Sequence, residues 1–189
     1  MDDPIRNSNH IAGDGAGAID EVDAAMRRHL VRTDPATGLA NRLVLVELLR
    51  SLALPPEPHE MVGGVTVAVE DVLAPAPPSR QADVATLLEE FGRFVADAAP
   101  EGGIAASIAD GLVLLVLPGR TGPSVQAVAA RLRALWMRRA WGVRRMPRPV
   151  LTITPRTVPM AAVGGGWLDD LVQEARRRAA APRRYRSVG

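Results

Sequence analysis

The chain has 189 residues, 47% of them hydrophobic and only 3% aromatic, so one domain can form with a core of mainly aliphatic side chains. The absence of cysteine excludes a disulfide framework, a zinc finger and a thiol nucleophile. No apolar run approaches the roughly 20 residues that a membrane helix needs, and the N-terminus does not resemble a secretory signal. We therefore expect a cytoplasmic protein without a transmembrane segment.

The net charge of +2 is unevenly distributed along the chain. Residues 1–130 hold 9 arginines and 18 acidic residues, whereas residues 131–189 hold 14 arginines and 3 acidic residues. A basic C-terminal third can bind phosphate, nucleic acid, an anionic membrane or an acidic protein. The alternative is a solvated helix face followed by a disordered tail.

Hydrophobic periodicity predicts the elements of the N-terminal half. Residues 1–15 are polar and rich in glycine, and we expect them to form a disordered leader. A lead-in helix over residues 16–32 follows, with an apolar stripe that includes Ile19, Val22, Met26 and Leu30. The next elements, in order, are a turn over 33–39, a helix from about 41, a strand over 65–69, and a helix over 84–98 that Asp83 caps.

The C-terminal half begins with a hairpin signal. Two apolar runs, 104–108 and 112–117, flank Asp110-Gly111, and such a pair favours a two-residue turn in which both residues take positive φ. The remaining elements are a helix over 126–139, a strand over 149–154 and a helix over 167–180. The core order is β-α-β-β-α-β, which predicts a ferredoxin-like α+β fold with a central antiparallel sheet flanked by helices.

The turn after the lead-in helix resembles the D-x-L-T-G-L-x-N-R signature that opens GGDEF domains, the domains of diguanylate cyclases. The matching residues are Asp34, Thr37, Gly38, Leu39, Asn41 and Arg42, and Ala36 replaces the usual leucine-like residue. The resemblance extends over residues 18–182 and implies a GGDEF-type fold with an N-terminal lead-in helix. It places the domain at 33–182 and leaves 183–189 as a basic tail.

The resemblance also implies that the catalytic chemistry is missing. Members of the family that act as cyclases join two GTP molecules, with the help of metal ions that are held chiefly by carboxylates. In the Gly-Gly-Asp/Glu-Glu-Phe turn of the family, the third and fourth positions are acidic. Here the third position is Gly111 and the fourth is Leu112, and the one acidic residue, Asp110, stands at the second position. The turn reads Ala109, Asp110, Gly111, Leu112, Val113. These replacements imply no catalytic residue, no bound metal and no cofactor.

Other elements of the family are altered as well. Glu70 or Asp71, depending on a one-residue register, could occupy the position of the carboxylate on the first strand. Asp83 matches the last residue of the guanine-binding segment, although its capping role is a sufficient explanation. We expect residual ligand contacts, if any remain, at these three residues.

Together these features predict a catalytically inactive, GGDEF-like regulatory domain of bacterial signalling. It would act by protein–protein interaction, through self-association or a partner at residues 16–32. One alternative is a non-catalytic sensor that binds GTP or cyclic di-GMP. Another is a nucleic-acid-binding protein, in which an anionic partner contacts the C-terminal arginines Arg176, Arg177, Arg178, Arg183, Arg184 and Arg186.

Overall fold

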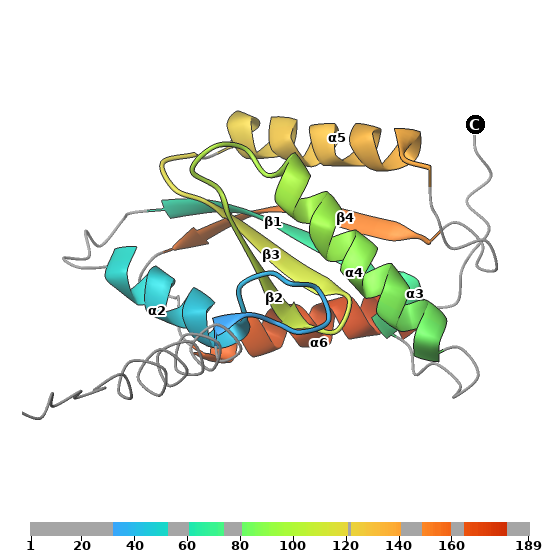
Figure 1. Ribbon diagram of the computed structural model, residues 1–189. Helices are drawn as coiled ribbons and strands as arrows, with labels where there is room; N and C mark the ends of the chain where they lie inside the picture. Colours follow the sequence, from blue (N-terminus) through green and yellow to red (C-terminus); the bar gives the residue numbers. More distant parts are fainter. Residues whose placement is uncertain are drawn as a thin grey trace, which may run out of the picture.

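The computed structural model describes six stretches of the chain, which are residues 32–52, 61–73, 81–120, 122–140, 149–159 and 165–180. The predicted leader, the lead-in helix and the basic tail lie outside these residues, except for Arg32. The elements are α2 (Arg42–Leu52), β1 (Met61–Val69), α3 (Glu70–Leu73), α4 (Gln81–Ala98), β2 (Ile104–Ala109), β3 (Leu112–Leu117), α5 (Pro123–Arg138), β4 (Leu151–Pro159) and α6 (Gly165–Ala180) (Figure 1).

The strands form one four-stranded sheet in the order β2-β3-β1-β4, and each neighbouring pair is antiparallel. Helices α4 and α5 cover one face of the sheet, and α2 and α6 cover the other (Figure 1). The observed order confirms the predicted β-α-β-β-α-β core. The described part of the chain is therefore an α+β domain with its sheet between two helical layers.

The two central strands are buried on both faces. In β1, Val65, Val67 and Val69 pack under α4 and α5, whereas Ala68 faces α2 and α6. All six side chains of β3 are buried, which explains its uninterrupted apolar sequence. A fully buried aliphatic side chain contributes about 1.5–3 kcal/mol relative to an exposed one, so this double burial is a main source of stability.

Phe91, Phe94 and Trp136 pack together in the core cluster under α4 and α5. The ring centroid of Trp136 lies 5.0 Å from that of Phe94 and 6.3 Å from that of Phe91, and both pairs are edge-to-face. The indole Nε1 of Trp136 donates to the carbonyl of Pro149 at 3.3 Å. Because its polar group is satisfied, Trp136 can link α5 to the start of β4 from a buried position.

Several elements are longer than the sequence pattern predicts. Strand β1 begins at Met61, because Gly63 and Gly64 belong to the strand. A Cβ on Gly63 would lie 2.2 Å from the carbonyl oxygen of Arg120, so the glycine permits a close approach of the β3–α5 loop. Strand β4 continues through Pro155 to Pro159, which is compatible with its position at the edge of the sheet.

The hairpin tip differs from the predicted turn. Gly111 has φ of 69°, but no non-glycine residue in the described part of the chain has positive φ, so the expectation for Asp110 is wrong. Asp110 and Gly111 form the predicted two-residue connection between the paired residues Ala109 and Leu112, but the β2–β3 pairing shifts between Ser107 and Ala109, so the hairpin has a bulge beside its turn. A Cβ on Gly111 would also lie 2.8 Å from Cβ of Val72, so packing against α3 adds a second constraint.

The signature turn is held by its own side chains. The carboxylate of Asp34 accepts hydrogen bonds from the Thr37 hydroxyl at 2.6 Å and from the Ala36 amide at 3.3 Å. The Thr37 hydroxyl in turn accepts from the Leu39 amide at 3.3 Å. Gly38 has φ of 72°, a conformation that glycine adopts without strain. These contacts give the signature residues of the turn a structural role.

The same turn connects three other parts of the domain. Its Ala40 carbonyl accepts from the Ser107 amide at 2.8 Å, which covers the outer edge of β2. The Asn41 side chain accepts from the Val44 amide at 3.1 Å at the start of α2. The Arg42 side chain pairs with Asp169 of α6 at 2.7 Å, and this hydrogen bond holds the pKa of the Asp169 carboxyl below its usual value.

The contact between the turn and α4 gives a test of the fold. A Cβ on Gly92 would lie 2.0 Å from the Thr37 carbonyl oxygen, so Gly92→Ala must push the turn away from α4. We expect it to lower the free energy of unfolding by about 3 kcal/mol or more in urea titrations. Gly166→Ala in α6, where nothing lies within 4 Å, should be neutral or slightly stabilising. Equal effects of the two substitutions would contradict the close approach.

Candidate functional site

A cleft with several charged side chains lies between α6 and the face of β1 and β4. The polar residues that line it are Thr66, Glu70, Thr152, Thr154, Arg156, Glu174 and Arg178. Its enclosed volume is about 20 Å³. A single water molecule needs about 10–15 Å³ by the same measure, so the cleft has room for about one water.

The floor of the cleft is apolar at the hairpin tip. Leu112 is directly opposite Ala68 across the β1–β3 ladder, and it is only 1% exposed. Both residues belong to the core cluster under α6, together with Leu171. Asp110 is exposed at the tip, and the next strand residue, Val113, faces the opposite core. Leu112, which stands at the position of the second acidic residue in the family's turn, is therefore inside the hydrophobic core.

Of the two candidate carboxylates after β1, Glu70 binds to β4 and Asp71 binds to the residue just before it. The carboxylate of Glu70 accepts a hydrogen bond from the Thr152 hydroxyl, and its backbone amide donates to the Val150 carbonyl at 3.1 Å. The carboxylate of Asp71 accepts from the Val150 amide at 3.1 Å. Of the two, Glu70 lines the cleft and Asp71 does not. Each of these carboxylates therefore ties α3 to the edge strand or to the residue before it.

Asp83 lies in the first turn of α4, two residues after the described start of the helix at Gln81. The expectation that it caps the helix is therefore wrong, because the helix begins earlier than the apolar pattern indicates. A carboxylate in the first turn still interacts favourably with the helix dipole. Asp83 is not among the residues that line the cleft.

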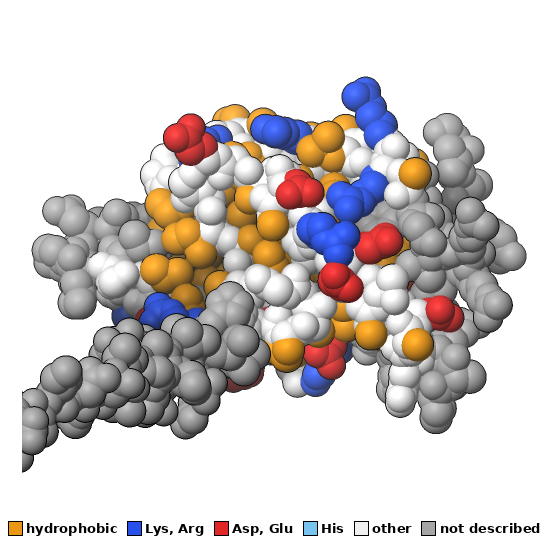
Figure 2. Space-filling model, in the orientation of Figure 1, with side chains coloured by type: hydrophobic (Ala, Val, Ile, Leu, Met, Phe, Trp, Pro, Cys, Tyr) orange, Lys and Arg blue, Asp and Glu red, His pale blue; other side chains and the backbone are white. Residues whose placement is uncertain are grey.

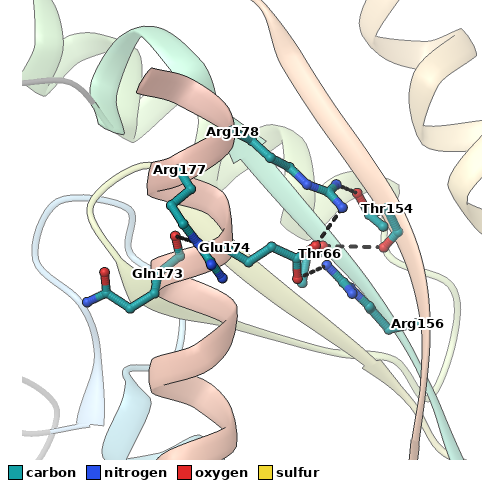
Figure 3. Close-up of polar contacts among 7 residues, drawn as sticks. All are labelled: Thr66, Thr154, Arg156, Gln173, Glu174, Arg177 and Arg178. Carbon is teal, nitrogen blue, oxygen red and sulfur yellow. Dashed lines mark hydrogen bonds and ion pairs between the residues drawn. The ribbon is translucent and has the colours of Figure 1, made fainter. Parts of the chain in front are cut away.

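An ion-pair cluster closes the rim of the cleft (Figure 3). The carboxylate of Glu174 contacts Arg156 of β4 through one oxygen and Arg178 of α6 through the other, each at 2.5 Å. Arg178 also donates to the Thr154 hydroxyl at 3.1 Å, and the Thr66 hydroxyl donates to the Thr154 carbonyl at 3.4 Å. Glu174 and Arg156 are 28% and 26% exposed, so the pair is largely removed from water.

The predicted arginine cluster is divided by the fold. Arg178 turns inward to Glu174 and Thr154, whereas Arg177 donates to the Gln173 carbonyl at 3.4 Å on the helix surface. Arg176 is exposed, and Arg183, Arg184 and Arg186 lie outside the described residues. The sequence reasoning did not find Arg156 or Glu174. The spacing of Glu174 and Arg178, four residues apart on a helix, was the one available signal.

The arrangement does not fit a magnesium site. Mg²⁺ needs several hard oxygen ligands, chiefly carboxylates and waters in octahedral geometry. Within the described part of the chain, no group of three or more Asp, Glu, His or Cys side chains could hold a metal ion. In the cleft, Glu70 is bonded to Thr152, Glu174 is paired with two arginines, and the hairpin tip contributes the hydrocarbon of Leu112.

Comparisons with known proteins identify the fold. The GGDEF domain of FimX from Pseudomonas aeruginosa superimposes with a TM-score of 0.60 at 18% identity, over 78% of this chain and 93% of that one. The coiled coil and GGDEF domain of DgcB from Caulobacter crescentus, in complex with c-di-GMP, gives 0.60 at 15% identity, over 87% and 92%. The diguanylate cyclase SiaD from Pseudomonas aeruginosa, in complex with its activator SiaC, gives 0.57 at 19% identity, over 86% and 64%.

The chain thus has the GGDEF-type fold that its signature turn indicates. No family model matches the sequence, and no curated protein does. The described helices include none that is long and apolar enough to cross a membrane. The likeness is therefore one of three-dimensional structure and of the signature turn.

The buried hairpin tip can be tested by restoring an acid there. Leu112→Glu would place a carboxylate inside the core cluster under α6, at a position that is only 1% exposed. We expect the free energy of unfolding to fall by more than about 3 kcal/mol in urea titrations. Asp110→Glu at the exposed tip is the control and should change stability by less than about 0.5 kcal/mol. A stable Leu112→Glu variant would contradict this placement.

Proposed function

We propose that this chain is a cytoplasmic GGDEF-fold regulatory domain of bacterial cyclic di-GMP signalling that does not synthesise the dinucleotide. It acts through contacts with protein partners. The observation that carries the proposal is Leu112, which is buried in the core at the hairpin tip where the family signature has an acid.

The chemistry of the reaction supports this reading. Joining two GTP molecules requires metal ions that stabilise the charge developing on the phosphoryl group, and those ions require carboxylate ligands. The cleft beside the hairpin tip provides Glu70 and Glu174, each already bonded to a neighbouring side chain. Sites for small molecules usually enclose about 300–1,000 Å³, far more than the 20 Å³ of this cleft.

The signature turn explains how the fold can persist without the reaction. Asp34 and Thr37 hold the turn together, Asn41 caps α2, and Arg42 joins α2 to α6. Each of these residues stabilises the domain directly. Selection for a folded scaffold is therefore sufficient to keep the signature, whether or not the cleft binds a nucleotide.

Protein contacts are the output that the comparisons favour. SiaD, which shares this fold, is bound to an activator protein, and the DgcB structure contains a coiled coil together with its GGDEF domain. In this chain the predicted lead-in helix at 16–32 would make such a contact. Its apolar stripe would pair with a partner helix or with a second copy.

Enzyme activity is the direct test. Purified protein incubated with GTP and Mg²⁺ should form no cyclic di-GMP by liquid chromatography, in parallel with an active diguanylate cyclase in the same buffer. Calorimetry with GTP and with cyclic di-GMP should show no heat of binding at high micromolar ligand. Product formation would overturn the proposal, and binding without turnover would support the sensor alternative.

Self-association can be tested within the lead-in segment. We expect Met26→Glu in the full chain to lower the mass measured by light scattering from that of a dimer to that of a monomer, because it places a charge in the apolar stripe. His29→Glu, off the predicted stripe, should leave the mass unchanged. A monomeric wild-type chain would exclude self-association and leave a different protein as the partner.

A further inference from the structure

The cluster at the rim of the cleft has the geometry of an anion held between two arginines. Glu174 Oε2 lies 2.5 Å from a guanidinium nitrogen of Arg156, and Glu174 Oε1 lies 2.5 Å from one of Arg178 (Figure 3). The two arginines come from different elements, β4 and α6, and meet at this one carboxylate. Guanidinium groups arranged in this way bind carboxylate and phosphate oxygens strongly and with defined geometry.

The arginines have more hydrogen-bonding capacity than Glu174 uses. Arg156 Nε is buried and has no hydrogen-bond partner among the described residues. A buried N–H without an acceptor is unfavourable, so this donor is available to any oxygen that reaches it. Arg178 keeps one donor on the Thr154 hydroxyl, which fixes the direction of its guanidinium.

The charge balance of the cleft depends on Glu174. The ionisable residues that line the cleft are Arg156, Arg178, Glu70 and Glu174, and their charges sum to zero. Glu70 is bonded to the Thr152 hydroxyl and contacts neither arginine. Loss of the Glu174 carboxylate would leave Arg156, which is 26% exposed, and Arg178, which is 48% exposed, without their anion. This is unfavourable for the partly buried Arg156 unless another anion replaces it.

We propose that Arg156 and Arg178 form an oxyanion-binding site that Glu174 fills from within the chain. The ligand class is a small anion with several oxygens, such as inorganic phosphate or pyrophosphate. In the wild-type protein the Glu174 side chain competes with such a ligand and keeps its affinity low. The inference concerns this pair of arginines and does not rest on the proposed function.

Removal of the internal anion should therefore create binding. We expect Glu174→Gln, which removes the charge that holds this side chain between the arginines and so lets it turn out to solvent, to bind pyrophosphate at least about tenfold more tightly than wild type by calorimetry without added metal. Glu89→Gln is the matched control, because Glu89 makes a single exposed ion pair with Arg93 at 2.6 Å and its removal changes the net charge equally. The control should bind as weakly as wild type.

A second variant locates the bound anion. Adding Arg156→Gln to Glu174→Gln should abolish the gained binding, because Arg156 supplies the buried donors. Equal pyrophosphate affinity in Glu174→Gln and Glu89→Gln would overturn the proposal, and so would binding that persists without Arg156. If Glu174→Gln does not fold, Glu174→Asp keeps the charge but is too short to reach both arginines. It should then show a smaller gain, and no gain would also overturn the proposal.

The assay separates this inference from the proposed function. It contains neither GTP nor Mg²⁺, so a cyclase activity would not affect its result. Conversely, a failure of Glu174→Gln to gain pyrophosphate binding leaves the prediction about cyclic di-GMP synthesis as it stands. Pyrophosphate binding in wild type as tight as in Glu174→Gln would show that Glu174 does not compete, and it would contradict the inference.

Discussion

The burial of β1 and β3 on both faces is the constraint on which the rest of the domain depends. Each side chain of these strands must pack against either the α4–α5 layer or the α2–α6 layer. An ionised group at such a position loses its hydration and needs a compensating partner. The hairpin tip is part of this system, because Leu112 is opposite Ala68 and beneath α6. The packing of the core thus determines which chemistry the tip can carry.

The glycines of the domain follow from the same close packing. Gly63, Gly92 and Gly111 each lie where a Cβ would collide with a neighbouring loop, turn or helix. Gly92 is the clearest case, because α4 there touches the backbone of the signature turn. The turn is in this way fixed on one side by α4 and on the other by β2. The signature turn thus contacts both helical layers and the edge of the sheet, which gives it a structural role independent of catalysis.

The sequence predicted the order and type of the elements because both depend on local patterns. Apolar periodicity found the helices, and the Asp110-Gly111 pair found the hairpin. The strand ends were missed, because Gly63, Gly64 and Pro155 are unfavourable in isolated strands and are accepted here through tertiary contacts and an edge position. The cleft was missed for a similar reason. Arg156 and Glu174 are 18 residues apart, and only the packing of α6 on β4 brings them together.

Helix α6 is attached to the sheet by two kinds of contact that have different consequences. Leu168, Leu171 and Val172 bury apolar surface, and this burial supplies most of the attachment energy. The partly buried ion pairs contribute less net energy, because desolvation of the charges offsets much of their attraction. Their main effect is geometric, since Glu174 sets the distance between β4 and the C-terminal half of α6. Changes at Glu174 should therefore alter what the cleft can bind more than they alter whether the domain folds.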